Sequence, residues 1–229
     1  MSSSQVDAKE EKGGIDSLMG DDHASSPSLL FFHEVGLVAL EFLEKHESVT
    51  NVVVDGKRRG LPSRDLFSFE RKIAPFTLPE DLKSFYLVSD GLLVTWSVQM
   101  GAEEKPLGHM RIMRLGEASV MPFLGGIAVV IDESPAGMVC IGFKKKGDAT
   151  ESAVYLRDNA GRYHFISTTF TNYFRLLLAH IGLPRWQLAF TPHGLDPLAR
   201  QWLAFFLPDR LKMDEEVMVR GEEEERRKK

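Results

Sequence analysis

The sequence predicts an α+β domain in which a mostly antiparallel sheet is flanked by an N-terminal helix, a short second helix and C-terminal helices. Two observations lead to this prediction. Apolar residues recur at helical spacing within residues 29–43, 82–86 and 170–181, whereas residues 92–166 contain short β-branched runs. Turn sequences such as SPAG, KKGD and DNAG separate most of those runs, and such turns favour hairpins over helical crossovers.

Composition and charge are those of an ordinary globular protein. The chain has 229 residues, of which 43% are hydrophobic and 27% charged, so it can bury a substantial core. Its 28 basic and 33 acidic residues give a formal net charge of -5. This balance excludes the strongly cationic field of indiscriminate nucleic-acid binding, and we expect no nucleic-acid partner.

The cysteine count and the apolar segments indicate a cytoplasmic protein. Cys140 is the only cysteine, so no internal disulfide can form and a reducing compartment is expected. The first residues lack the apolar stretch of a secretory signal. The longest candidate span is interrupted by His33, Glu34 and Glu41, so we expect no membrane insertion.

Polar segments divide the chain into a tail, a body and a second tail. Residues 1–26 are nearly free of large apolar side chains, and we expect them to be disordered. Residues 27–207 form the expected domain. Residues 208–229 are expected as a charged tail ending in EEEERRKK, which either stays solvated, the favoured interpretation, or pairs its charges along a frayed helix.

The N-terminal part of the body predicts helix, strand and helix. Ser26 and Pro27 suit a helix start, and the helix should end near His46. Its apolar stripe is formed by Leu29, Phe32, Val35, Leu37, Leu40 and Leu43. The β-branched run 49–55 predicts a strand, and the turn GKRRG follows it. Residues 79–81 place carboxylates at the start of a second helix, which ends at Asp90 and Gly91.

The remaining body predicts strands and then further helices. The strands are expected at 92–98, 109–115, 126–132, 137–145, 153–157 and 162–166. Thr168 or Thr169 can cap the next helix, which Gly182 and Pro184 end. The apolar face of that helix comprises Phe170, Tyr173, Phe174, Leu177, Leu178 and Ile181. A last helix is expected to begin at Asp196 and Pro197 and to end at Pro208. One side of it carries Leu198, Trp202, Phe205 and Phe206, and we expect Trp202 to lie in the core.

No motif in the chain predicts catalysis, a cofactor or a metal. The run GFKKKG has the glycine spacing of a phosphate loop, but Asp148 and Ala149 stand where Lys and a hydroxyl residue are needed. The seven histidines lack paired-ligand spacing. An apolar strand around Cys140 favours a core thiol over a nucleophile. Carboxylates that folding brings together leave an enzyme open as the weaker alternative.

Two sets of residues resemble known families. The first set resembles the SUKH superfamily. It consists of residues 78–86 (LPEDLKSFY), the pair Asp90 and Gly91, and then TWSV (95–98) and PLG (106–108). The C-terminal half is similar to the family of subunit 2 of the tubulin polyglutamylase complex. The residues that carry this similarity run from His164 and Phe165 through GLPRWQ (182–187) to Gln201 and Trp202. The similarity spans roughly residues 30–206.

The resemblance implies an α+β SUKH fold and a non-catalytic scaffold or adaptor subunit. Catalysis would belong to a tubulin tyrosine ligase-like partner that adds glutamate chains to tubulin with ATP. The resemblance also implies that other subunits of the complex are partners. It implies a location at microtubules, the basal body and the cilium or flagellum. Tyr163, Arg185 and the short C-terminal end depart from the family pattern, so a role for the long tail of animal members does not carry over.

Aromatic residues near the C-terminal end suggest where partners bind. Large aromatics usually pack in a core, but Trp, Phe and Arg are also enriched in interface hot spots. Arg185, Trp186 and Gln187 lie on a connection that must keep its backbone satisfied, and Arg200 and Gln201 project away from the apolar side of the last helix. These five residues are the predicted partner contacts. Asp90 and Trp96 are added because SUKH members often bind ligands near this motif, although a core Trp beside a turn Asp is the alternative.

Three further possibilities stay open. The basic turns 57–59 and 144–146 either attract the acidic tails of tubulin or are ordinary solvated turns. The domain could also be a general SUKH protein-binding module in another complex. An unrecognised enzyme would have to turn over substrate as the purified chain alone.

Overall fold

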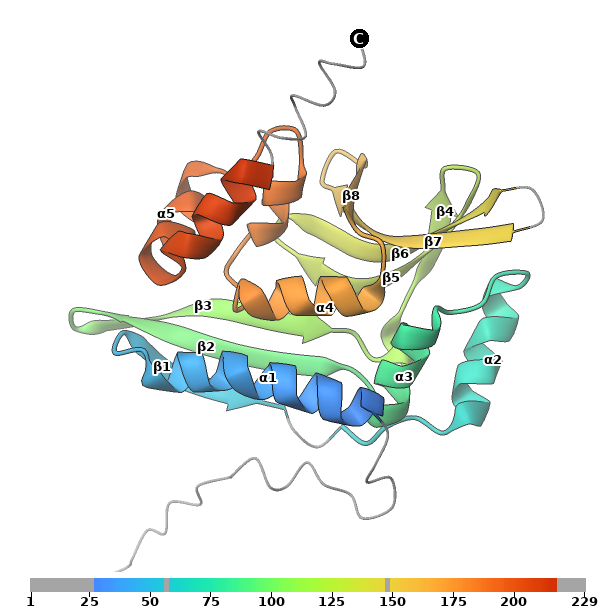
Figure 1. Ribbon diagram of the computed structural model, residues 1–229, viewed down its shortest axis with the longest axis horizontal. Coiled ribbons are helices and arrows are strands. Elements are labelled where there is room, and N and C mark those ends of the chain that lie inside the picture. The colour runs from blue at the N-terminus through green and yellow to red at the C-terminus, as the bar shows by residue number, and fades with distance from the viewer. Residues whose placement is uncertain (1–26, 56–57, 147–148, 218–229) are drawn as a thin grey trace, which may run out of the picture.

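The computed structural model describes residues 27–55, 58–146 and 149–217, and within them it confirms the predicted α+β class. Where the sequence predicts one mostly antiparallel sheet, the structure has two (Figure 1). One sheet has three strands in the order β1-β2-β3, and the other has five in the order β4-β5-β6-β7-β8. The expected tail at 1–26 lies outside the described residues.

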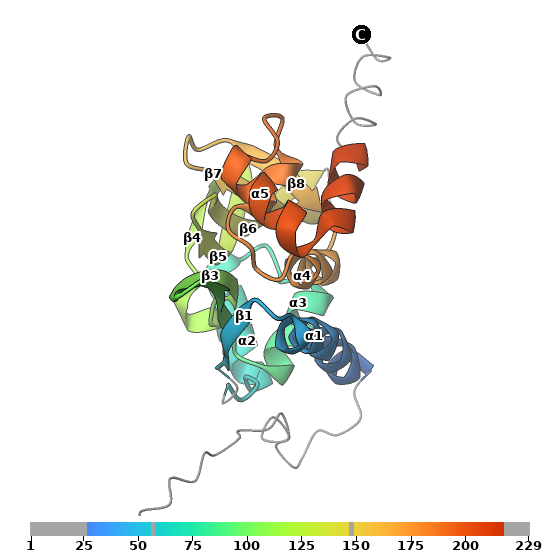
Figure 2. The same cartoon turned by 90° about the vertical axis from the view of Figure 1, so that its left-hand side faces the viewer.

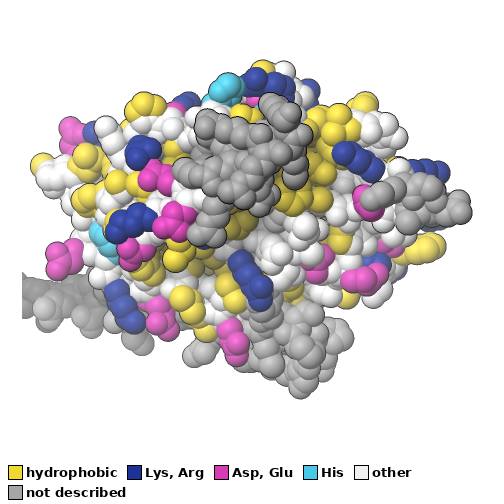
Figure 3. Space-filling view, turned by 45° about the horizontal axis from the view of Figure 1, so that its top comes forward, with side chains coloured by type: hydrophobic (Ala, Val, Ile, Leu, Met, Phe, Trp, Pro, Cys, Tyr) yellow, Lys and Arg dark blue, Asp and Glu magenta, His cyan; other side chains and the backbone are white. Residues whose placement is uncertain are grey.

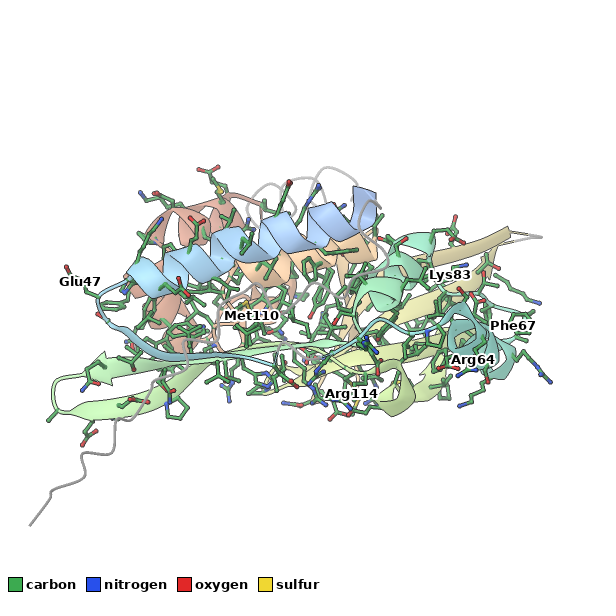
Figure 4. The ribbon with its side chains drawn as sticks, turned by 90° about the horizontal axis from the view of Figure 1, so that it is seen from below. Glu47, Arg64, Phe67, Lys83, Met110 and Arg114 are labelled. Carbon is green, nitrogen blue, oxygen red and sulfur yellow. The ribbon has the colours of Figure 1, made fainter. Side chains whose placement is uncertain are left out.

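The three-stranded sheet comes from β1 (Val49–Val54), β2 (Leu92–Met100) and β3 (Glu103–Ile112). All its strand pairs are antiparallel. Along β2 the side chains of Val94, Trp96 and Val98 are buried, as period-two alternation requires when one face covers a core. Met110 of β3 is fully buried and lies between the sheet and the helices above it (Figure 4).

The five-stranded sheet contains β4 (Val120–Phe123), β5 (Gly126–Ser134), β6 (Gly137–Lys146), β7 (Ala149–Asp158) and β8 (Tyr163–Ser167). Its two faces pack against different clusters. Val139, Ile141 and Phe143 of β6 point into the main core, and Cys140 between them packs with Phe123 on the other face. The sequence analysis did not predict β4, which contains Pro122; proline is tolerated there because β4 is an edge strand.

The break between the sheets lies just after β3. The backbone N–H of Met113 donates to the carbonyl of Ile131 at 2.7 Å, and a single turn, η2 (Leu115–Glu117), follows. Asp90 stabilises this turn, since its Oδ1 accepts from the N–H of Leu115 at 2.9 Å. The chain therefore leaves the first sheet three residues earlier than the strand predicted at 109–115.

Five helices cover the sheets: α1 (Pro27–Lys45), α2 (Ser63–Ile73), α3 (Glu80–Val88), α4 (Phe170–Ala179) and α5 (Pro197–Phe206). Two predicted caps are confirmed, because Thr169 accepts from the N–H of Asn172 and Asp196 accepts from the N–H of Ala199. The sequence missed α2, although Leu66, Phe69 and Ile73 are buried at helical spacing.

Aromatic rings join three of these helices at the centre of the molecule. Phe32 of α1 contacts Phe85 of α3 and Phe174 of α4 with ring centroids 5.4 and 5.1 Å apart. The start of α3 is also tied to the start of α4, because Asp81 Oδ2 accepts from the N–H of Thr171 at 2.8 Å. Figure 2 shows α5 at one end of the molecule and α1, α2 and β1 toward the other.

Residues 208–217 form a further helix, although the sequence assigns them to the charged tail. Leu211 is 9% exposed and Asp214 is 4% exposed, so one side of this helix faces the body of the protein. The folded part therefore continues beyond residue 207. Only residues 218–229 of the expected tail lie outside the described residues.

A buried carboxyl group interrupts the apolar interior of the second sheet. Asp132 of β5 is 2% exposed, and its Oδ1 has no hydrogen-bond partner among the described residues. Burial raises the pKa of Asp132 to about 8, although the charge of Arg111 and the N–H of Glu133 act in the opposite direction. The carboxyl is therefore largely protonated in the folded protein at pH 7.

We expect Asp132 to make the fold less stable as the pH rises from about 4 to about 8. The unfolded carboxyl ionises near pH 4, whereas the folded one keeps its proton, so rising pH favours unfolding by about 1.4 kcal/mol per pH unit at most. Asp132→Asn should remove this slope, and its stability relative to wild type should improve between pH 5 and pH 8. Urea unfolding at several pH values measures the effect. The variant Glu44→Gln, at an exposed carboxylate of α1, should keep the wild-type slope, and a pH-independent effect of Asp132→Asn would contradict the assignment.

Candidate partner-binding corner

The candidate site centres on residues 181–187, which we call the corner; they follow α4 and include the first two residues of the short helix η3 (Trp186–Phe190). Three of its residues have positive φ angles: Ile181 at 47°, Gly182 at 66° and Arg185 at 62°. Gly182 adopts this region without strain, whereas a β-branched residue such as Ile181 rarely does. The corner is therefore held in its shape by its surroundings.

Contacts with the first sheet hold the corner. The indole Nε1 of Trp96 donates to the carbonyl of Ile181 at 2.8 Å, and the N–H of His109 donates to the carbonyl of Gly182 at 2.9 Å. Gly108 makes room for the indole, because a Cβ at that position would collide with it. Trp96, which the sequence predicts as a partner contact, is therefore a buried residue that holds the corner against the first sheet.

Trp186 belongs to a buried aromatic stack under the corner. Its ring lies parallel to that of His180, with centroids 4.3 Å apart and planes 18° apart, and the ring of Tyr173 stacks on it at 6.0 Å. Phe190 meets the edge of Trp186 at 6.1 Å. Ring contacts with His180, Tyr173 and Phe190 pack Trp186 tightly, so the cluster helps to fix the direction of the corner.

A buried hydrogen-bond network connects this stack to the helix at 208–217. The Nδ1 of His180 lies 2.7 Å from the carbonyl of Leu176, and its Nε2 lies 2.9 Å from Asp214 Oδ2. Arg210 donates to the other oxygen of Asp214. Burial acts to raise the pKa of Asp214, but the hydrogen bonds from His180 and Arg210 outweigh it and hold that pKa below its usual value. The last helix is therefore pinned beside the corner by an ionised carboxylate.

Two surface ion pairs link the elements here: one joins the corner to the start of α5, and the other joins α5 to the helix at 208–217. Arg185 Nη1 lies 2.9 Å from Asp196 Oδ2, and the same carboxylate caps α5 through the N–H of Ala199. On α5 itself, Arg200 Nη2 lies 2.6 Å from Oε1 of Glu215. Exposed pairs of this kind contribute little stability. Their effect here is to fix the positions of two basic side chains at the surface.

The corner forms one wall of a cavity of about 470 Å³. The other walls are Leu107 and His109 of β3 and residues 133–135 at the turn between β5 and β6. This volume falls in the range of ordinary ligand pockets, about 300–1,000 Å³.

The predicted contact residues divide into an exposed and a buried group. Arg185, Arg200 and Gln201 are exposed at the corner and on α5. Trp186, Gln187 and Trp96 are 1%, 3% and 1% exposed and contribute almost no surface. Asp90 is part-buried and stabilises the turn after β3, away from the corner. Partner binding at these seven residues stays a prediction.

The apolar side of α5 is not where the sequence predicts it. The residues that pack inward are Ala199, Leu203 and Phe206, whereas Leu198 and Phe205 are each 56% exposed. Trp202 is only partly buried. The prediction that Leu198 and Phe205 face the core with Trp202 is therefore wrong. Trp202 still packs against the core, and Phe206, predicted on the same side, is buried as expected. Leu198 and Phe205 present their apolar side chains to the surface. Figure 3 shows hydrophobic side chains exposed among charged ones on the side of the molecule that it views.

The other sequence-predicted features have local partners. Arg58 donates to Asp55 Oδ2 through Nη2 at 2.7 Å, and the Nζ of Lys144 lies 5.2 Å from the centre of the Phe123 ring. Lys57 and the side chain of Lys146 lie outside the described residues. Burial raises the pKa of Cys140 to about 12. Its thiol is therefore protonated at neutral pH.

In the part of the chain that the structure describes, no group of three or more His, Cys, Asp or Glu side chains is placed to hold a metal ion. Among the described helices, none combines the length and apolar composition needed to cross a bilayer.

Comparison with known proteins gave three related sequences with the same name, tubulin polyglutamylase complex subunit 2. The protein from Rattus norvegicus is 32% identical over 204 residues, which cover 72% of this chain and 68% of that protein. The Homo sapiens protein is 30% identical over 228 residues, covering 82% and 75%. The Mus musculus protein is 31% identical over 204 residues. No protein-family model and no solved structure matched.

We expect Trp96→Phe to lower the free energy of unfolding by about 2–4 kcal/mol, because it leaves the buried carbonyl of Ile181 without its donor and opens a small void. Urea unfolding measures the loss. Trp202→Phe is the matched control, since Trp202 is partly buried and gives up a similar volume. Equal losses in the two variants would show that the indole hydrogen bond does not hold the corner.

Proposed function

The chain belongs to the family of tubulin polyglutamylase complex subunit 2, and we propose that it is a non-catalytic scaffold or adaptor subunit of such a complex. The observation that carries this proposal is the similarity to three subunits of that name over most of the chain. In this proposal a tubulin tyrosine ligase-like partner adds glutamate chains to tubulin. The chain would work in the cytoplasm at microtubules, including those of the basal body and the cilium or flagellum.

We further propose that the ligase-like subunit binds the surface formed by Arg185 and the outward side of α5. That surface combines basic and polar side chains, at Arg185, Arg200 and Gln201, with the exposed apolar groups of Leu198 and Phe205. Interface centres are enriched in aromatic residues and arginine, and polar groups surround them. The surface of Arg185 and α5 has the same kind of composition, with an exposed aromatic ring at Phe205 and arginines near it.

The buried part of the corner supports this proposal by making the surface rigid. Trp186 packs against the rings of His180 and Tyr173, and Trp96 donates to the backbone carbonyl of Ile181. A surface that is ordered before binding loses less conformational entropy when a partner docks. Trp96, Trp186 and Gln187 would therefore contribute to binding by positioning the exposed residues.

The proposal predicts that Phe205→Glu separates the chain from the ligase-like subunit. Phe205 is 56% exposed, so the charge should be tolerated by the fold but should weaken a desolvated contact by about tenfold or more. The measurement is affinity purification of the tagged chain from a ciliated or flagellated cell, with the ligase-like subunit quantified by mass spectrometry.

The matched control is Phe67→Glu. Phe67 is 64% exposed and points outward from α2, on a different side of the molecule (Figure 4). Its recovery of the complex should equal that of wild type. Equal recovery with both variants would exclude α5 as the contact. Repeated absence of a ligase-like subunit from the wild-type purification, or glutamylation of tubulin by the chain alone, would refute the adaptor function itself.

A further inference from the structure

The helix at 208–217 is attached to the rest of the protein by few buried side chains. Leu211 is 9% exposed and Asp214 is 4% exposed, and the other side chains of this helix are exposed or half-buried. Two further apolar side chains, Met213 and Val217, are 56% and 60% exposed. Helices in globular proteins are normally held by a broad apolar face. Because this helix has so small an apolar face, its attachment depends strongly on Asp214.

Asp214 contacts His180, the last residue of α4, and both ring nitrogens of His180 face acceptors. Nδ1 lies 2.7 Å from the carbonyl oxygen of Leu176, which can only accept. Nε2 lies 2.9 Å from Oδ2 of Asp214. Burial acts to raise the pKa of Asp214, but its hydrogen bonds outweigh burial, so the carboxylate is ionised at neutral pH and also can only accept. A neutral imidazole has one N–H and two are needed here, so His180 carries a proton on both nitrogens.

The groups around His180 also favour a positively charged ring. Trp186 of η3 lies parallel to it with centroids 4.3 Å apart, and the face of an indole attracts a cation. On the helix at 208–217, Arg210 opposes a second positive charge, but it bonds to the other oxygen of Asp214. Tyr173 of α4 contacts Trp186, and burial raises the pKa of Tyr173 well above its usual value, so this phenol stays neutral. The carboxylate of Asp214 is thus shared by two cations.

We propose that His180 and Asp214 form a proton-dependent latch that holds the helix at 208–217 against the end of α4. When the ring loses one proton, it can donate to Leu176 or to Asp214 but not to both. The bare nitrogen then presents a lone pair to an acceptor at hydrogen-bond distance, which is repulsive. Asp214 keeps the hydrogen bond from Arg210 on its own helix, so the carboxylate can leave the ring without becoming unpaired.

Protons therefore favour the docked helix. In the released state the ring meets water, where an imidazole gives up its second proton near pH ~6.5. Above that pH, docking takes up one proton, and its equilibrium constant falls by up to about tenfold for each pH unit. Asp214 sets the acidic limit, because its pKa lies below the usual value for a carboxyl group. The latch is closed in mildly acidic solution and opens as the pH rises.

Release of the helix would change the surface that we propose for the partner. Glu215 of the helix at 208–217 pairs with Arg200 of α5 at 2.6 Å, and release would separate this pair. Binding of a partner at α5 would then depend on pH. This consequence rests on the proposed function, whereas the latch is a property of the chain alone.

Hydrogen exchange of the purified chain at about pH 6 and about pH 8.5 tests the latch, with each rate divided by the intrinsic rate at that pH. We expect the protection of residues 208–217 to fall by about tenfold or more between the two, as the loss of one proton predicts. Asp132 also titrates in this range, so Asp132→Asn is measured in parallel and should show the same fall in residues 208–217. Protection of residues 208–217 that does not change with pH would overturn the proposal.

Two variants on the same helix separate the latch from general charge effects. Asp214→Asn keeps the shape of the side chain, and its amide can donate to a neutral ring nitrogen, so protection of residues 208–217 should no longer depend on pH. Asp209→Asn is the matched control, because the side chain of Asp209 is 89% exposed, and it should keep the wild-type response. A wild-type response in Asp214→Asn would refute the role of this carboxylate.

The nitrogen resonances of the His180 ring report its protons directly. In the wild-type chain at about pH 6, NMR should show both ring nitrogens protonated. One protonated and one bare nitrogen in the docked chain would overturn the proposal. These results are independent of the affinity purification: failure of the latch leaves the adaptor function standing, and failure to recover a ligase-like subunit leaves the latch standing.

Discussion

The candidate site depends on keeping Ile181 in a left-handed backbone conformation that β-branched residues rarely adopt. The hydrogen bond from Trp96 to its carbonyl supplies that constraint, and it joins segments 85 residues apart in the sequence. Gly108 accommodates the indole and Gly182 continues the turn. Because the bond runs from the central strand of the first sheet to the end of α4, it fixes the corner relative to both sheet and helix.

The hydrogen bonds of His180 and Arg210 to Asp214 also hold the region of the corner in place. The ring of His180 stacks on Trp186, and His180 shares Asp214 with Arg210, so the helix at 208–217 is attached through two buried side chains and one part-buried side chain. Such networks add little net stability over an apolar core, yet removing one partner costs about 3–5 kcal/mol. They therefore specify one arrangement strongly. The helix at 208–217 is thereby held beside the corner.

Local signals in the sequence predicted much of the fold and less of the site. Thr169 and Asp196 cap their helices as predicted, because capping depends only on neighbouring N–H groups. The sequence could not show which side of α5 faces inward, because two sets of apolar residues share the helical spacing. Leu198 and Phe205 are seven residues apart, and so are the buried residues Ala199 and Phe206. That choice is made by tertiary packing. The exposure of Arg185 and the burial of Gln187 depend on the same non-local contacts.

The central claim is that this chain recruits a catalytic partner through the corner and α5. Hydrogen exchange of the chain alone and within the purified complex tests it most directly, because amide protection reports which backbone becomes ordered or covered on binding. The account predicts slower exchange in the complex for residues 182–187 and 197–206, with no change in α2 at 63–73. Slower exchange confined to α2 or to the three-stranded sheet, with residues 182–206 unchanged, would contradict it.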